Sequence, residues 1–390
     1  MQLPTQCVLQ ITPFKNGTIP ALEVCGGQPF LGWLMREYMR FGIRDFVLLA
    51  DPALEETLKN FCRSLSDFLP QKPSLRLLLR PAREGLQDSF VASKDLLEES
   101  YIFAPAHVLF DGNLSRFIAL AGLRRIPGGI LATEDGRDTS IRLYTRARVL
   151  GEVICGEKMI PPIGLTARMD QIPIVGTFYD LAVDGDFARA DTDLPTQLIR
   201  PAVFFDRDGV LNVDYDMVST VDRFTWMDGA LAAVRAVRDA GMHAFIVTNQ
   251  GAVGHGAYTE NDVNTLHAYM QNEARKSGAG FDDIRYCPFH PTGEVKAYRG
   301  DSDWRKPHPG MVLDLMEKWH VNPVGSLMIG DKGSDVMCAK NAGIPGHLFT
   351  GTNLANALIP LLPGANTSVF GRVTHIDYGW KPDDVPVVPL

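Results

Sequence analysis

Short runs of β-branched and aromatic residues alternate along this chain with longer stretches whose apolar residues have helical spacing. Such alternation predicts strands linked by helices, the pattern of α/β folds with largely parallel sheets. The predicted strands are 7–11, 45–49, 202–205, 243–248 and 326–329, and the predicted helices are 30–41, 230–240 and 311–319.

A polar segment with two prolines, 189–201, interrupts this alternation near the middle of the 390 residues. A new apolar strand follows it, so we place a domain boundary there. Each half is expected to be a Rossmann-like, three-layer α/β domain with a mostly parallel sheet. The predicted divisions are an N-terminal domain at 1–190, a linker at 191–200, a C-terminal domain at 201–355 and a C-terminal extension at 356–390.

Charge and cysteine usage exclude several classes of protein. Lys plus Arg is 38 and Asp plus Glu is 46, and the net charge of −8 argues against binding of nucleic acid or an anionic membrane. No apolar run approaches the roughly 18 residues of a membrane span, and the N-terminus lacks the pattern of a secretory signal. The six cysteines are scattered, so we expect reduced thiols in a cytoplasmic protein. Homo-oligomerisation is left open.

The segment 203–212 joins an apolar strand to two carboxylates, Asp206 and Asp208, and then to Gly209. In an open parallel sheet, ligands bind at the carboxyl ends of strands, where both aspartates are expected. One carboxylate can attack a phosphoryl group and form an aspartyl-phosphate. The other can protonate the leaving oxygen and then activate water. A capped turn is the alternative interpretation of this segment alone.

Three further segments place polar groups after strands or before a helix. One predicted strand ends in Thr248 and Asn249, whose hydroxyl and backbone N–H groups can hold phosphate oxygens. Arg305 and Lys306 precede a predicted helix, and Lys306 can neutralise phosphate charge. Another strand is followed by Asp331, which offers the hard oxygen ligands that Mg²⁺ prefers.

These four segments, in this order, resemble the haloacid dehalogenase superfamily of phosphohydrolases over about residues 200–350. The resemblance implies a capless domain, because only about 35 residues separate the first segment from the second. It implies that Asp206 is the nucleophile and that Asp208 is the general acid and base. It also implies that Thr248, Asn249 and Lys306 bind the phosphate. The implied Mg²⁺ ligands are Asp206, Asp331 and the backbone carbonyl of Asp208, and Asp335 and Lys332 would orient this metal site without binding the ion.

Within that superfamily, the chain resembles the D-glycero-D-manno-heptose 1,7-bisphosphate 7-phosphatase group on residues 212–229, 286–291 and 305–311. The related histidinol-phosphate phosphatases share much of this pattern. The resemblance implies that Arg305 contacts the part of the substrate beyond the scissile phosphate, with His255 as a second contact. A second phosphate suits Arg305, because a guanidinium forks onto phosphate oxygens.

Two departures from the group's pattern concern zinc and the substrate. Many members hold zinc with Cys-x-His and a later Cys-x-Cys, but here Phe289 follows Cys287, and Ser302 and Trp304 occupy the later cysteine places. A tetrahedral Zn²⁺ site needs four ligands, so we expect no structural zinc. His255 replaces the group's usual arginine and cannot make the same bidentate contact, which leaves the identity of the sugar open.

Residues 1–190 resemble sugar-1-phosphate nucleotidyltransferases on 19–31, 42–48 and 176–187. That family's first loop is glycine-rich because its N–H groups cradle a triphosphate, whereas this chain has Pro13 and Phe14 there. His107 replaces a metal-binding aspartate, and only Asp180 remains of the pair. We therefore expect a degenerate, scaffold-like domain in which Lys15 and His107 can still bind a sugar phosphate or nucleotide.

The leading hypothesis is an Mg²⁺-dependent phosphatase that acts on heptose 1,7-bisphosphate or a related sugar phosphate in nucleotide-sugar or surface-polysaccharide biosynthesis. The first alternative is a phosphatase of histidinol phosphate or another small phosphomonoester. The second is a bifunctional enzyme that also performs sugar-1-phosphate nucleotidyl transfer. The third is a protein that binds phosphorylated sugars without cleaving them.

Overall fold

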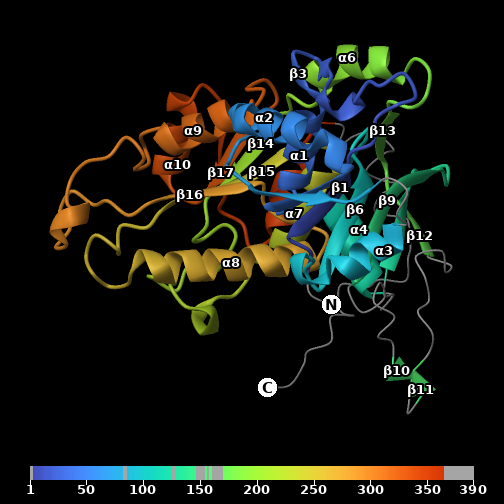
Figure 1. Cartoon of the computed structure of the whole chain (residues 1–390). Coiled ribbons are helices and arrows are strands. Elements are labelled where there is room, and N and C mark those ends of the chain that lie inside the picture. Colours follow the sequence, from blue (N-terminus) through green and yellow to red (C-terminus); the bar gives the residue numbers. More distant parts are fainter. Residues whose placement is uncertain are drawn as a thin grey trace.

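The computed structural model describes residues 3–81, 86–123, 128–145, 154–155, 158–159 and 170–363 (Figure 1). These residues form an α/β protein with one main sheet of seven strands and another of five. The α/β class predicted from the alternating pattern is confirmed. No helix among the described residues is long and apolar enough to cross a bilayer, while the predicted cytoplasmic location stays a prediction.

The seven-stranded sheet lies in the N-terminal half and is parallel except at β9, which runs antiparallel to β6 and β8. In spatial order its strands are β12 (Asp170–Pro173), β8 (Gly128–Ala132), β9 (Asp138–Thr145), β6 (Ser100–Pro105), β1 (Gln6–Gln10), β4 (Asp45–Ala50) and β5 (Ser74–Leu79). The helices of this half are α1 (Phe30–Met39), α2 (Glu55–Leu65), α3 (Leu86–Ala92), α4 (Leu114–Leu123) and α6 (Asp186–Gln197).

Three two-stranded ribbons accompany the seven-stranded sheet. They are β2 (Val24–Cys25) with β3 (Gln28–Pro29), β7 (Val108–Gly112) with β13 (Gly176–Asp180), and β10 (Ile154–Cys155) with β11 (Lys158–Met159). In the loop after β1, the ring of Phe14 lies edge-on to His107, with 5.7 Å between the ring centroids. His107 Nε2 is 3.7 Å from Asp180 Oδ1. An aromatic side chain therefore occupies the carboxyl end of β1, where the sequence places Phe14 instead of a glycine-rich loop.

The five-stranded sheet is wholly parallel and belongs to the C-terminal half. In spatial order its strands are β16 (Asp283–Cys287), β15 (His243–Asn249), β14 (Ala202–Phe205), β17 (Leu327–Gly330) and β18 (Gly346–Leu348). Its helices are α7 (Ala230–Asp239), α8 (Glu260–Lys276), α9 (Gly310–Trp319), α10 (Gly333–Asn341) and α11 (Leu354–Leu358). In residues 206–242, all of them described, α7 is the one α-helix, which agrees with the predicted absence of a cap domain.

Alternation along the central strands sends side chains to two different cores. Phe204 of β14 and Phe245 of β15 join a large apolar cluster that also contains residues of the N-terminal half. Val203 and Phe205 point to the opposite face and pack in a second cluster. Because successive side chains of a strand face opposite sides, continuous apolar runs like these indicate strands that are buried on both faces.

The predicted divisions of the chain stay predictions. The proposed linker at 191–200 contains the last turns of α6, and Pro195 lies inside that helix. At the other end, the proposed extension begins within α11, and Leu358 and Leu362 are buried in the second cluster. Residues 364–390, which make up most of the extension, lie outside the described residues.

Candidate active site

Two aspartates lie side by side at the carboxyl edge of the five-stranded sheet. Asp206 follows β14 and Asp331 follows β17, and these strands are parallel neighbours with Phe205 opposite Ile329. The Asp206 N–H donates to Ile329 O at 3.0 Å, which continues the strand pairing to the first carboxylate. Both carboxylates therefore occupy the edge at which open parallel sheets bind ligands.

Gly209 permits the close approach of the two loops. Its φ is +81°, a backbone conformation that side-chain-bearing residues rarely adopt. A Cβ at this position would collide with the Asp331 carboxylate. The glycine after Asp208, which the sequence marks as a tight reversal, is thus required for contact between the loops that follow β14 and β17.

Lys306 pairs with two carboxylates of the site, those of Asp206 and Asp335. Its Nζ lies 2.7 Å from Asp206 Oδ1 and 2.7 Å from Asp335 Oδ1, and it donates to Val247 O at 3.0 Å. Burial alone would lower the pKa of Lys306, but the two carboxylates raise it above its ordinary value. Lys306 is therefore a fixed positive charge beside Asp206, as its predicted phosphate-binding role requires.

Three carboxylates converge closely enough to hold one cation. Oxygens of Asp206, Asp331 and Asp335 all lie within 4.8 Å of one another. Within the described part of the chain, Asp331 Oδ1 is buried without a hydrogen-bond partner, and burial raises the pKa of Asp331. These three carboxylates fit Mg²⁺, which takes hard oxygen ligands. The ion would compensate the negative charge of the carboxylates that the single positive charge of Lys306 leaves unbalanced. Asp335, predicted to act from outside the metal site, lies within this cluster.

Asp208 turns its carboxylate toward its neighbour in sequence. Arg207 Nη2 donates to Asp208 Oδ2 at 2.8 Å, while Asn212 Nδ2 and Gln250 Nε2 donate to the carboxylate at 3.1 and 3.0 Å. Burial by itself would raise the pKa of Asp208, but Arg207 and these donors lower it below the ordinary range. Asp208 is therefore ionised at rest, the form that can accept a proton.

Gln250 ties two of the predicted site residues together. Its Nε2 donates at 3.0 Å both to Asp208 Oδ2 and to Thr248 Oγ1, and Tyr258 Oη donates to its Oε1 at 2.6 Å. Gln250 and Thr248 are each 1 % exposed. The sequence does not mark Gln250 or Arg207 as site residues, although each is next to a predicted one, because nothing local shows where their side chains point.

The Asn249 side chain holds the backbone of Lys306. Asn249 Nδ2 donates to Lys306 O at 3.1 Å, and Lys306 N donates to Asn249 Oδ1 at 3.0 Å. Both ends of the amide are therefore engaged with the loop that carries the lysine. The predicted phosphate contact of Asn249 stays a prediction, and its observed role is to position Lys306.

The two predicted substrate contacts lie near a histidine that the sequence did not single out for this site. Arg305 Nη1 donates to Phe289 O at 3.0 Å and borders Gly251. The rings of His255 and His290 are 4.5 Å apart between centroids. Burial, with Arg305 and His255 nearby, lowers the pKa of His290. Arg305 and two half-buried imidazoles thus surround the loop at Gly251.

Lys332 lies on the outer side of the carboxylate cluster. Its side chain is 57 % exposed, with Nζ 3.6 Å from Asp214 Oδ2 and 3.8 Å from Asp331 Oδ2. Its backbone N–H donates to Asp335 Oδ2 at 2.9 Å and so caps the start of α10. Lys332 therefore positions Asp335 through its backbone.

Aromatic and hydrogen-bonded contacts hold the loop between β16 and Arg305. The Phe289 ring packs edge-on against Tyr298 with 5.8 Å between centroids. Glu260 accepts from Tyr298 Oη at 2.5 Å and from Tyr286 Oη at 2.7 Å. Phe289, at the position where the family pattern has a histidine, therefore packs against an aromatic ring that is itself fixed to α8.

We expect this loop to need no zinc. Purified protein should contain far less than one zinc per chain by mass spectrometry, and a zinc-selective chelator should leave the thermal unfolding temperature unchanged. Tyr298→Ala should lower that temperature, because it removes both the ring contact and the bond to Glu260. One tightly held zinc per chain whose removal destabilises the protein would refute this expectation.

Comparison with known proteins finds relatives of the C-terminal half among phosphatases. A HAD-hydrolase-like family model matches residues 303–360. A D-glycero-beta-D-manno-heptose-1,7-bisphosphate 7-phosphatase of Rhodopseudomonas palustris is 48 % identical over 155 residues, which cover 40 % of this chain and 86 % of that protein.

Two solved structures are similar to parts of the chain. The D,D-heptose 1,7-bisphosphate phosphatase of B. bronchiseptica, complexed with magnesium and phosphate, is 28 % identical with a TM-score of 0.35, covering 42 % of this chain and 89 % of that one. UDP-glucose pyrophosphorylase from Acinetobacter baumannii is 12 % identical with a TM-score of 0.39, covering 49 % and 93 %. On the 48 % identity and near-complete coverage of the Rhodopseudomonas enzyme, the chain belongs through its C-terminal half to the heptose-1,7-bisphosphate 7-phosphatase family of HAD-type phosphatases.

Proposed function

We propose that this chain is an Mg²⁺-dependent phosphatase whose substrate is D-glycero-D-manno-heptose 1,7-bisphosphate or a closely related sugar phosphate, within nucleotide-sugar or surface-polysaccharide biosynthesis. The observation that carries the proposal is the convergence of Asp206, Asp331 and Asp335 around Lys306 at one sheet edge. The names of the relatives, which specify a heptose bisphosphate, support the choice of sugar.

Asp206 is the proposed nucleophile. Its Oδ1 accepts from Arg207 N at 2.7 Å and faces Lys306 Nζ, so Oδ2 is the oxygen that attacks phosphorus. A bond forms between Oδ2 and phosphorus as the bond from phosphorus to the sugar oxygen breaks. Asp208, ionised at rest, takes up one proton from solvent when the cycle begins and gives it to the leaving sugar oxygen. It then accepts a proton from the water that attacks the aspartyl-phosphate, and inorganic phosphate leaves with Asp206 regenerated.

The charged groups around Asp206 have complementary tasks in this mechanism. Lys306 and the Thr248 hydroxyl hold the phosphate oxygens, and Gln250 keeps Thr248 and Asp208 at a fixed separation. When bound by Asp206, Asp331 and the backbone carbonyl of Asp208, with Asp335 beside these ligands, Mg²⁺ would supply positive charge that offsets the phosphate and the carboxylates.

Phosphate release from a substrate panel tests the proposal. The panel contains heptose 1,7-bisphosphate in both anomers, hexose bisphosphates, sugar monophosphates and histidinol phosphate, each with Mg²⁺ and with EDTA. We expect one sugar bisphosphate to be strongly preferred, with loss of activity in EDTA and recovery on addition of excess Mg²⁺. Preference for histidinol phosphate would show that the substrate is not a sugar phosphate. Negligible phosphate release from every compound would refute the proposal that the chain is a sugar phosphatase.

Arg305→Ala should weaken binding of a bisphosphate more than of a monophosphate. Loss of a hydrogen bond to a charged group corresponds to an increase of about 10- to 100-fold in KM. We expect little change in KM for a sugar carrying only the scissile phosphate. Steady-state kinetics on the two substrates checks this, with Arg305→Lys as the variant that retains charge but lacks the fork. Equal effects of Arg305→Ala on both substrates would exclude a contact with the second phosphate.

A further inference from the structure

The N-terminal half contacts the amino edge of the phosphatase sheet. Arg40, which directly follows α1, donates from Nη2 to Met242 O at 3.1 Å and from Nε to Asp282 Oδ1 at 3.1 Å. Met242 precedes β15 and Asp282 precedes β16. Since Asp206 follows β14 at the opposite end, this contact leaves the catalytic edge uncovered.

Asp282 is the centre of the contact and is fully buried. Within its own half, its carboxylate pairs with Arg238 Nη1 and with His243 Nδ1 at 2.8 Å, and it accepts a hydrogen bond from the Ala244 N–H at 2.8 Å. From the other half, Arg40 Nε pairs with the same carboxylate. A buried carboxylate requires such complete pairing. Without Arg40, this pairing is incomplete.

The ion network continues into the N-terminal half. Glu37 Oε2 accepts from Arg40 Nη1 at 2.9 Å and from Arg200 Nη2 at 3.0 Å. Arg200 Nη1 lies 2.8 Å from Asp111 Oδ1. Three guanidiniums, those of Arg40, Arg200 and Arg238, thus balance the carboxylates of Glu37, Asp111 and Asp282. Arg40 joins the two parts of this network, because it pairs with Glu37 on one side and with Asp282 on the other.

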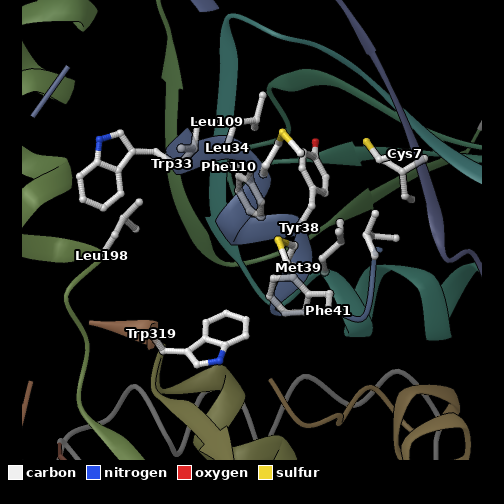
Figure 2. Close-up of a cluster of buried hydrophobic side chains, with 14 of the residues drawn as sticks. Cys7, Trp33, Leu34, Tyr38, Met39, Phe41, Leu109, Phe110, Leu198 and Trp319 are labelled. Carbon is white, nitrogen blue, oxygen red and sulfur yellow. The ribbon is translucent and has the colours of Figure 1, made fainter. Parts of the chain in front are cut away.

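Apolar contacts surround this network. Trp319, the last residue of α9, is fully buried in the same cluster as Phe41 and Leu198, and Figure 2 draws these three side chains with Tyr38 and Met39. The Arg238 guanidinium lies 4.5 Å from the centre of the Phe41 ring. One apolar core is therefore shared between the two halves.

A second contact joins the start of α4 to the end of α7 and to the loop after α8. Asn113 Nδ2 donates to Asp239 Oδ1 at 2.9 Å and to Gly278 O at 3.0 Å. Arg116 Nη1 pairs with Asp239 Oδ2 at 3.2 Å. The interface is thus broad, with buried polar bonds at two separate places.

We propose that the N-terminal half is a permanent structural partner of the phosphatase half, so that the two halves unfold as one cooperative unit. Its role is to cover the amino edge of the phosphatase sheet and complete the pairing of Asp282. This role is independent of the proposed substrate, and it gives the N-terminal half a function that requires no chemistry at Lys15, His107 or Asp180.

Hydrogen exchange of the full chain tests the proposal, with β4 peptides reporting on the N-terminal half and β15 peptides on the phosphatase half. In the unaltered protein, the slowest amides of both halves should exchange through one opening with the same dependence on denaturant. Arg40→Met should accelerate exchange of the slowest amides by about 100-fold in both halves, because it removes one partner from each of two buried carboxylates, Glu37 and Asp282. Asn113→Ala provides a milder variant at the second contact and should act on both halves equally.

Arg63→Met is the matched control, since Arg63 is exposed on α2 and, among the residues that the structure describes, its side chain is hydrogen-bonded to Asn60 alone, at 2.7 Å. It should leave exchange in both halves unchanged. Acceleration confined to β4 peptides in Arg40→Met and Asn113→Ala, or separate denaturant dependences of the two halves in the unaltered protein, would overturn the proposal. None of these readouts uses phosphatase activity, so failure of the proposed substrate would not imitate either result.

Discussion

Asp206→Asn should abolish phosphate release, with kcat lowered by about 10⁴-fold or more, since removal of a covalent nucleophile has effects of this size. The amide cannot form the aspartyl-phosphate, although its oxygen can still accept from Arg207 N and Lys306. The fold should persist because Lys306 keeps its pairing with Asp335. Initial rates on the best substrate of the unaltered protein, together with circular dichroism, measure both outcomes.

Asp222→Asn is the control for this substitution. Asp222 is exposed in the same half and is not one of the three clustered carboxylates, so its substitution makes the same chemical change outside the cluster. It should retain full activity. A folded Asp206→Asn protein with activity close to that of the control would exclude Asp206 as the nucleophile, and another carboxylate of the cluster would then have to be tested.

Asp282→Asn should destabilise the protein by about 3–5 kcal/mol, the range found when one partner of a buried ion pair is removed. The change leaves the Arg238 and Arg40 guanidiniums without their shared carboxylate in a site from which water is excluded. Urea unfolding followed by fluorescence measures the free energy of unfolding. Asp222→Asn again serves as the control, and equal stability of the two variants would show that the pairing contributes nothing.

The free energy of unfolding should decrease as the pH falls below about 6.5. Burial lowers the pKa of His243 to about 4, with Asp282 opposing the shift and Arg40 and Arg200 adding to it. An unfolded histidine titrates near 6.5, so the unfolded chain binds the proton first and stability should fall as the pH drops from about 6.5 to about 4. Arg238, His243 and Arg40 overcome burial to lower the pKa of Asp282, so its contribution is lost below the ordinary aspartate range. A flat profile between pH 7 and pH 4 would contradict the assignment to His243.

Much of the active site is readable from the sequence because its residues directly follow buried strands. An apolar run that ends in Asp206, or in Thr248, or in Gly330 and Asp331, specifies both the strand and the edge at which its last residue lies. Parallel pairing then brings these ends together without further information. The α/β class and the five strands and three helices predicted above follow from the same local patterns.

Other features depend on pairings between residues distant in sequence, which local patterns do not encode. The Asn249 amide faces Lys306, and Gln250 links Thr248 to Asp208. The carboxylate of Asp335 joins those of Asp206 and Asp331 because α10 begins just after β17, the parallel neighbour of β14. The directions of these side chains are decided by packing against neighbouring loops, so they emerge only in the folded protein.

The clearest division between sequence and tertiary structure concerns the two halves. The sequence alone determined that each half is an α/β unit and that the C-terminal one carries phosphatase residues at its strand ends. Only the tertiary structure decided that Arg40 and Glu37 meet Arg200, Arg238 and Asp282 in a shared interior. The sequence around a charged residue does not tell whether that residue lies on the surface or in the core, because its burial depends on partners that the fold brings from elsewhere in the chain.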